Sequence, residues 1–262
     1  LYMPASYTHQ CFGNRVLENL NDKDIKDIID QNINYYNIGL QGPDILFFYR
    51  PLKKTSVSAL GSKLHEDIAR EFFENALAIL KNNYDKRALA YILGFINHFI
   101  LDSTCHGYIN KTMQDKNIGH FEIERDLEQR FMIINHDEFN FCVPKHYTIN
   151  LEVAKVIAPF FKLEAKDILI ALKSFRRFNQ LFACKSKIKR NFVLTAMKIV
   201  NAKKYQGMII REIPEKRIEE NIDVLVNQFI QAANIAVKEI VGYCYSLKNN
   251  TEISKRFDCN YE

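Results

Sequence analysis

Two short stretches of the chain combine histidine and carboxylate residues in a pattern that could bind metal. The first, G-F-I-N-H-F-I-L-D-S-T-C-H, places His98, Asp102 and His106 in an otherwise strongly apolar run. Residues four apart on an α-helix lie on one face, about 40° and one turn from each other, so these three would form a single polar stripe. The second stretch, H-F-E-I-E, repeats the spacing with His120 and Glu124.

The apolar surroundings predict that these carboxylates are buried, where an unpaired negative charge is unfavourable. A buried carboxylate needs a lysine or arginine partner, a proton or a metal ion, because burying it alone is very costly. No lysine or arginine occurs between Ala88 and His106. A single histidine on an apolar face is usually a satisfied core residue, but an imidazole and a carboxylate at i, i+4 form half of a zinc site. We therefore expect buried zinc.

Further ligands must come from elsewhere in the chain, since a zinc ion takes three or four protein ligands. His9 lies near the amino terminus in S-Y-T-H, and Asp44 lies in the turn-rich segment G-L-Q-G-P-D. His65 follows Gly61 near the start of an expected helix. Of the seven histidines, only His136 and His146 then remain without a role.

The elements that must position these residues are predicted to be helices. Glycine (9) and proline (6) are scarce for 262 residues, which favours long helices over many short strands. Apolar spacing predicts helices over 22–33, 64–81, 86–108 and 121–134, and four more beyond residue 151, the last over 215–247. Residues 139–150 alternate weakly and are the only strand-like stretch. We expect one compact all-α domain over 3–262, built of many helices around a buried zinc cluster.

Composition limits the remaining possibilities. The net charge of +5 suits an anionic substrate or surface but falls short of a dedicated nucleic-acid binder. Six scattered cysteines without a C-x-x-C motif are expected to be buried or incidental thiols. No apolar run is judged long enough to span a membrane, and no signal peptide is visible. This favours a cytoplasmic location, or secretion if the chain is a processed form. Leu1-Tyr2 are left out of the fold interpretation, with Met3 as a candidate native start.

The order of the motifs resembles a known family. "YTHQCFGN", "GLQGPDILFFY", "GSKLH", "YILGFINHFILDSTCH" and "HFEIE" are similar to successive motifs of the bacterial zinc-dependent phospholipase C family. That family is related in fold and metal site to the single-strand nucleases of the S1/P1 type. The motifs span residues 7–124, and helices within 151–262 would complete the domain. No β-sandwich lipid-binding module is evident.

The resemblance implies a cluster of two to three zinc ions. Asp44, His65, His98 and Asp102 would hold the first ion, Asp102 would bridge to an ion that also binds His9, and His106, His120 and Glu124 would hold the remaining one. His98 and His106 would lie about 12 Å apart along a helix, too far to share an ion. The implied reaction is hydrolysis of a phosphodiester, with Asp44 as both ligand and candidate general base.

Two positions depart from the family pattern. The secreted relatives complete the His9-type site with an amino-terminal tryptophan, and this chain has none. The relatives that cleave phosphatidylcholine have aromatic residues where this chain has Ile45 and Ser62. A choline group needs aromatic faces for cation–π contact, so no preference for choline is expected. Phe47, Phe48 and Tyr49 stand nearby, and they fit core packing equally well.

Alternative interpretations remain open at this point. The zinc centre could serve a single-strand nuclease or another phosphoesterase, or it could stabilise a non-catalytic binding module. The dipeptide His136-Asp137 could suggest an HD-type phosphohydrolase, although it lies in a polar run at a helix end. The basic runs 173–177 and 185–190 could contact anionic lipid or nucleic acid, though most such runs are only solvated. The expected partner is a phospholipid or other phosphodiester, with peripheral contact to an anionic membrane surface.

Overall fold

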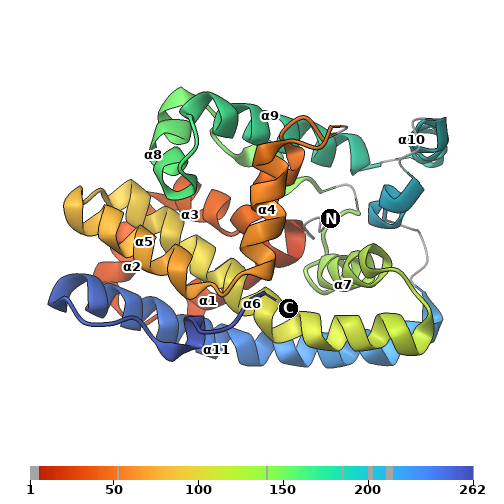
Figure 1. Cartoon of the computed structure of the whole chain (residues 1–262). Coiled ribbons are helices and arrows are strands. Elements are labelled where there is room, and N and C mark those ends of the chain that lie inside the picture. The colour runs from red at the N-terminus through yellow and green to blue at the C-terminus, as the bar shows by residue number, and fades with distance from the viewer. Residues whose placement is uncertain are drawn as a thin grey trace.

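The computed structural model describes residues 6–51, 53–139, 141–184, 186–199, 203–210 and 215–261, and Figure 1 shows the arrangement. Within these ranges the chain forms helices and no strand. The α-helices are α1 (Ser6–Asn19), α2 (Lys23–Gln31), α3 (Ile33–Gly39), α4 (Ser56–Glu66), α5 (Arg70–Asn82), α6 (Lys86–Lys116), α7 (His120–Ile134), α8 (Leu151–Phe161), α9 (Ala165–Phe182), α10 (Lys187–Ile199) and α11 (Glu219–Asn249). Short 3-10 helices are η1 (Gly42–Phe48), η2 (Val143–His146), η3 (Lys203–Met208), η4 (Lys216–Ile218) and η5 (Lys255–Phe257). The predicted all-α class is confirmed.

Helix α6 is the central element of the fold. The side chain of Asp85 caps it by accepting a hydrogen bond from the backbone N–H of Arg87 at 2.8 Å, and Asn117 ends it in the left-handed conformation, φ 48°. α6 continues past Tyr108, where the sequence predicted its end, because Ile109 and Thr112 still face the interior. α3, α11 and α1 pack around it. Its core sequence is buried on nearly every face, which explains why it is apolar all round.

The length and apolar character of α6 differ from the expectation that no apolar run could span a membrane. By length and mean hydropathy (1.3), α6 is long and apolar enough to cross a membrane. However, 89% of that apolar window is buried inside the protein. Packing against neighbouring helices therefore accounts for its apolar character.

A close approach between α3 and α6 brings the turn that carries Asp44 next to α6. A Cβ atom on Gly39 would lie 2.1 Å from the carbonyl oxygen of Tyr91, and one on Gly94 would lie 2.1 Å from that of Tyr36. Only glycine allows backbones to approach so closely. Next to this crossing, the side-chain amide of Asn97 donates to the Tyr36 hydroxyl at 2.6 Å. That hydroxyl donates to the carbonyl of Gly13 at 3.0 Å, so the network also holds α1 in place.

Several predicted elements differ from the observed ones. The helix predicted over 64–81 is divided into α4 and α5, with Asp67 in an extended conformation between them. The strand-like alternation over 139–150 gave a wrong prediction, because that segment contains η2, which Pro144 helps to start. The helix over 22–33 is confirmed as α2, capped by Asp22, and α8 to α11 match the four helices expected beyond residue 151.

The segment after α11 turns back to the metal-binding region. The N–H of Ala69 donates to the carbonyl of Cys259 at 2.9 Å, and the N–H of Tyr261 donates to that of His65 at 3.3 Å. Arg70 adds an ion pair with Asp258. In Figure 1 the carboxyl end lies beside α4 and α6. The last helix and the segment after it thus pack on the first half of the chain, and the single domain over 3–262 stays a prediction.

Candidate metal centre

The polar stripe of α6 is buried, as its sequence predicted. Nε2 of His98 lies 3.1 Å from Oδ2 of Asp102, and Nε2 of His106 lies 3.9 Å from Oδ1 of the same carboxylate. All three residues are almost fully enclosed. Asp102 therefore lies between two imidazoles, one turn away on either side.

Asp44 reaches the stripe from η1, and His65 reaches it from the end of α4. Oδ1 of Asp44 lies 3.1 Å from Nε2 of His65. Nδ1 of His65 is 2.8 Å from the carbonyl of Gly61, and Nδ1 of His98 is 3.2 Å from that of Leu40. A carbonyl only accepts hydrogen bonds, so each Nδ1 carries the proton and each Nε2 is left to bind a metal.

The turn that carries Asp44 depends on Gly42. This residue has φ +52°, and an added Cβ would lie 2.1 Å from the His98 ring. Glycine is required there both by the backbone conformation and by the imidazole against it. η1 begins at Gly42 with Pro43 next to it, and Asp44 therefore lies in its first turn.

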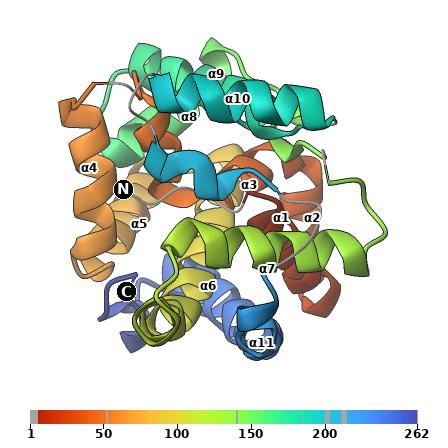
Figure 2. The same cartoon turned by 90° about the vertical axis from the view of Figure 1, so that its right-hand side faces the viewer.

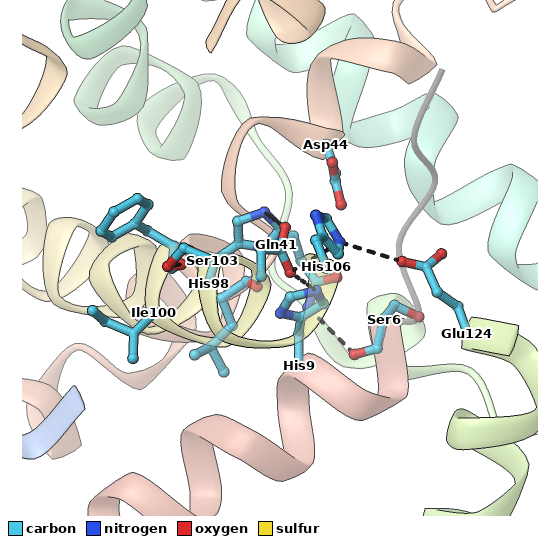
Figure 3. A network of polar contacts seen from close by, with 12 residues as sticks. Ser6, His9, Gln41, Asp44, His98, Ile100, Ser103, His106 and Glu124 are labelled. Atoms are coloured by element: carbon cyan, nitrogen blue, oxygen red, sulfur yellow. Dashed lines mark hydrogen bonds and ion pairs between the residues drawn. The ribbon is translucent and has the colours of Figure 1, made fainter. Parts of the chain in front are cut away.

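His9 approaches from α1 on the other side of Asp102. Its Nε2 lies 3.4 Å from Oδ1 of Asp102. Its ring stacks on the ring of His98, with centroids 4.3 Å apart and planes 23° apart. Figure 3 shows His9 of α1, Asp44 of η1, and His98 and His106 of α6 pointing into the same space.

The third set of residues joins α6 to α7. Nε2 of His120 lies 2.9 Å from Oε1 of Glu124, and Nε2 of His106 lies 3.8 Å from the same oxygen. The two imidazole rings are edge to face, with centroids 5.2 Å apart. α7 begins at His120, one residue before its predicted start, so that residue lies in its first turn.

All eight residues singled out in the sequence fall into groups whose ligand atoms lie within 4.8 Å of one another. The groups are His9, His98 and Asp102; Asp44, His65 and His98; and His106, His120 and Glu124. The last group has the membership that the resemblance implied. In the other two, His98 is the shared residue, whereas the resemblance gave Asp102 the bridging position.

Charge and burial act together on these groups. Burial alone would raise the pKa of Asp102, but His98, His106 and His9 together hold it well below its usual range. Burial alone would lower the pKa of His106, but the carboxylates of Asp102 and Glu124 raise it to about 9. Burial and the neighbouring His98 lower the pKa of His9 to about 4. Histidine thus takes the place of lysine and arginine as the partner of the carboxylates.

The residues fit zinc by an independent criterion. Nδ1 of His9, Oδ1 of Asp44 and Nε2 of His98 are buried polar atoms without a hydrogen-bond partner. Such atoms are rare in folded proteins unless an ion or water satisfies them. Imidazole nitrogens and carboxylate oxygens are ordinary zinc ligands, and within the described part of the chain Asp44 and Asp102 form their ion pairs with histidines.

The structure places Tyr261, which the motifs did not reveal, next to the candidate metal ligands. Tyr261 is buried against the imidazoles of His65 and His98, with ring centroids 4.9 and 5.9 Å apart. Burial and the charges of Asp102 and Asp44 raise the pKa of its phenol far above the usual value. Nothing in the sequence around Tyr261 signals this position, because its contacts are with residues more than 160 positions earlier in the chain.

Other residues considered in the sequence lie outside these groups. Asp137 accepts a hydrogen bond from the Tyr7 hydroxyl, and His136 follows the end of α7 with φ 57°. Neither joins a metal-binding group in the described part of the chain, and neither does His146, whose ring stacks on Phe141. The HD-type interpretation therefore has no geometric support.

Comparison with known families decides what this centre belongs to. The sequence profile described as zinc-dependent phospholipase C matches residues 8–236. The chain belongs to the zinc-dependent phospholipase C family. No curated protein and no solved structure matches it. All eight candidate ligands lie inside the matched range, and Tyr261 lies outside it.

Membership in the zinc-dependent phospholipase C family establishes the class of reaction. The protein is an enzyme that hydrolyses a phosphodiester bond, its substrate is a phospholipid and its cofactor is zinc. The alternative of a non-catalytic zinc-stabilised module is thereby wrong. The six cysteines are free thiols and take no part in the metal-binding groups of the described residues.

Proposed function

We propose that the eight grouped residues bind two to three zinc ions and that this centre cleaves phospholipids on the glycerol side of the phosphate. The observation that supports the proposal most directly is the packing of three ligand groups along one helix, with His98 common to two of them. Zinc, when bound, would polarise the phosphoryl oxygens and lower the pKa of a water molecule toward neutrality.

The side chains of the protein have separate tasks in this proposal. Asp44 is the candidate general base, because Oδ1 is buried, faces the site and lacks a hydrogen bond. It would orient the attacking water and accept its proton. Leu40 and Gly61 fix the ring orientations of His98 and His65 through their carbonyls. Asp102 keeps the imidazoles around it turned toward the common space.

The positions of Ile45 and Ser62 support a broad headgroup preference. Ile45 is fully buried and Ser62 is partly buried, and neither has an aromatic face. The ring of Phe47 stacks on that of His65 with centroids 5.5 Å apart, and the ring of Phe48 packs on that of Phe175 with centroids 5.0 Å apart. Both side chains are therefore part of the packed interior. No choline cage is formed by these residues. Neutral and anionic headgroups should therefore be accepted as well as choline.

The test uses the zinc-loaded protein on a short-chain phospholipid, on single-stranded nucleic acid and on an aryl phosphodiester. We expect hydrolysis of the phospholipid, with phosphate left on the headgroup. Asp44→Asn should lower kcat by about 10²–10⁴-fold, whereas Asp67→Asn, an exposed carboxylate at the end of α4, should leave it unchanged.

Each outcome of this test has a clear meaning. Zinc content measured on the same samples shows whether Asp44→Asn acts through metal loss or through the proton transfer. Faster cleavage of nucleic acid than of phospholipid would favour the nuclease alternative. Inactivity on all three substrates would disprove the proposed reaction.

A further inference from the structure

Helix α10 has two apolar faces, and only one of them is buried. Val193 and Met197 pack with Ile209 in a small cluster separate from the main core. On the other side, Ile188 is 83%, Phe192 71% and Ile199 80% exposed. These are the three highest exposed fractions among the large apolar side chains of the described residues.

The exposed residues form one stripe. At 100° per residue, positions 188, 192 and 199 lie within about 40° of one another around the helix axis, opposite the buried pair. Exposed apolar side chains scattered singly are normal on a protein surface, but a continuous apolar stripe marks an interaction surface. The stripe of Ile188, Phe192 and Ile199 is called the α10 stripe below.

The charge around the α10 stripe indicates what it binds. Between residues 168 and 210 the sequence contains no aspartate or glutamate and ten basic residues: Lys173, Arg176, Arg177, Lys185, Lys187, Lys189, Arg190, Lys198, Lys203 and Lys204. This segment has a formal charge of +10, against +5 for the whole chain, so the rest of the chain is net negative. On the described surface, Lys187 and Lys198 of α10 and Arg177 of α9 are exposed.

A helix with an apolar stripe flanked by lysine and arginine is typical of segments that lie in the interface of an anionic membrane. Hydrogen bonds hold α10 against the end of α9. Nζ of Lys189 on α10 donates to the carbonyls of Gln180 and Ala183, both at 2.9 Å, at the carboxyl-terminal end of α9.

Helix α10 contacts η3, and η3 in turn contacts α7, the helix that carries His120 and Glu124. The side-chain amide of Gln206 donates to the carbonyl of Leu194 on α10 at 2.8 Å, and Tyr205 packs on Phe121 of α7 with centroids 6.0 Å apart. Figure 2 shows α9 and α10 above η3, with α7 below it. One hollow is lined by Glu124 of α7, by Phe182 at the end of α9, by Met208 at the end of η3 and by Ile210 just after it.

We propose that α10 docks the enzyme on anionic phospholipid bilayers, with the α10 stripe among the upper acyl chains and the flanking cations on the headgroups. This inference rests on the proposed function, because it assigns to a phospholipid-cleaving enzyme the surface that meets its substrate. Docking through α10 would bring the bilayer next to the hollow that leads to Glu124.

The test measures binding and catalysis separately. The variant Ile188→Ser, Phe192→Ser, Ile199→Ser is compared with a control variant, Ile230→Ser, Val241→Ser, Tyr245→Ser, which removes three exposed apolar side chains from α11. Co-sedimentation is measured with vesicles that mix phosphatidylglycerol with phosphatidylcholine, and with vesicles of phosphatidylcholine alone. We expect the α10 variant to bind the mixed vesicles at least about tenfold more weakly, and the α11 variant to bind them like the wild type.

A second variant, Lys187→Glu with Lys198→Glu, should lose binding to the mixed vesicles and change little with phosphatidylcholine alone. Hydrolysis of a monomeric short-chain phospholipid should be the same in all variants, whereas vesicle hydrolysis should fall with binding. If no phospholipid is cleaved but the α10 variant still loses vesicle binding, the proposed reaction fails and the docking surface stands. Unchanged vesicle binding by the α10 variant, or a wild-type dimer that forms through this stripe and ignores vesicles, would overturn the inference.

Discussion

The ring of Tyr261 packs against the imidazole of His65, with centroids 4.9 Å apart, while its backbone N–H donates to the carbonyl of the same residue at 3.3 Å. A residue outside the region matched by the family profile thus holds a candidate zinc ligand from two sides. Groups that orient metal ligands often affect metal affinity nearly as strongly as the ligands do.

Removing the ring should therefore loosen the metal. Tyr261→Ala is expected to weaken zinc retention against a chelator by about 10–100-fold, whereas Tyr261→Phe keeps the ring contact and should retain zinc like the wild type. Tyr245→Ala, on the exposed face of α11, serves as the control. Zinc content after dialysis and the absorption spectrum of the cobalt-substituted protein provide the readouts. Equal retention by the alanine and phenylalanine variants would show that the ring has no positioning role.

A methyl group at residue 42 should displace an imidazole. Gly42→Ala forces a left-handed conformation on alanine, which costs about 1–2 kcal/mol, and places Cβ against the His98 ring. We expect a lower melting temperature together with zinc loss. Gly242→Ala is the matched control, because a Cβ there meets nothing within 4 Å, and it should stabilise α11 by up to about 1 kcal/mol. Full zinc content in Gly42→Ala would contradict the fit described for the turn.

Asp102 should matter more for zinc content than His9. Its carboxylate lies within 4 Å of three imidazoles, those of His98, His9 and His106, whereas Nε2 of His9 pairs with the carboxylate of Asp102. Elemental analysis should find two to three zinc ions per chain in the wild type, and Asp102→Ala should release more zinc than His9→Ala. Thr104→Ala on the same helix provides a control. Equal loss from the two ligand variants would argue against a shared role for Asp102.

Zinc binding should release a proton from His106 near neutral pH. Its folded pKa of about 9 exceeds the ordinary 6.5, so the metal-free protein holds a proton there that zinc must displace. Zinc affinity should rise with pH and level off above about 9. In the metal-free protein, the stabilisation from this proton is complete below pH 6.5 and is lost as the pH rises through 9.

Calorimetry in buffers of different ionisation enthalpy counts the protons released. His106→Asn should release about one proton fewer than the wild type. His9→Asn should not change the count, because the pKa of His9 is lowered to about 4 and that residue is already neutral. An identical count for wild type and His106→Asn would refute the assignment.

Headgroup selectivity should be weak. Each missing cation–π contact forgoes about 0.5–2 kcal/mol, and Ile45 and Ser62 offer no such face. We expect phosphatidylcholine, phosphatidylethanolamine and phosphatidylglycerol, compared as monomeric short-chain substrates, to have kcat/KM values within about tenfold of one another. A stronger choline preference would mean that other aromatic residues form the cage.

The sequence predicted the features that depend on local spacing. The i, i+4 pattern of His98, Asp102 and His106 requires only a helix, and apolar periodicity locates that helix well. The sequence did not predict the break between α4 and α5, because the N–H of Ala69, two residues after Asp67, donates to the carbonyl of the distant Cys259. The position of Tyr261 was missed for the same reason, since a contact of that range leaves no local pattern.

The contact of Tyr261 with His65 also has a consequence for biosynthesis. Glu124, the last of the eight candidate ligands along the chain, is made 137 residues before Tyr261, which corresponds to roughly 7–27 seconds of translation at 5–20 residues per second. During that interval a nascent chain carries all eight ligands while Tyr261, which packs on His65 and His98, has not been made. A lipid-cleaving centre would therefore be completed only after Tyr261 has been made, and products terminated before that residue would lack the side chain that packs on His65 and His98.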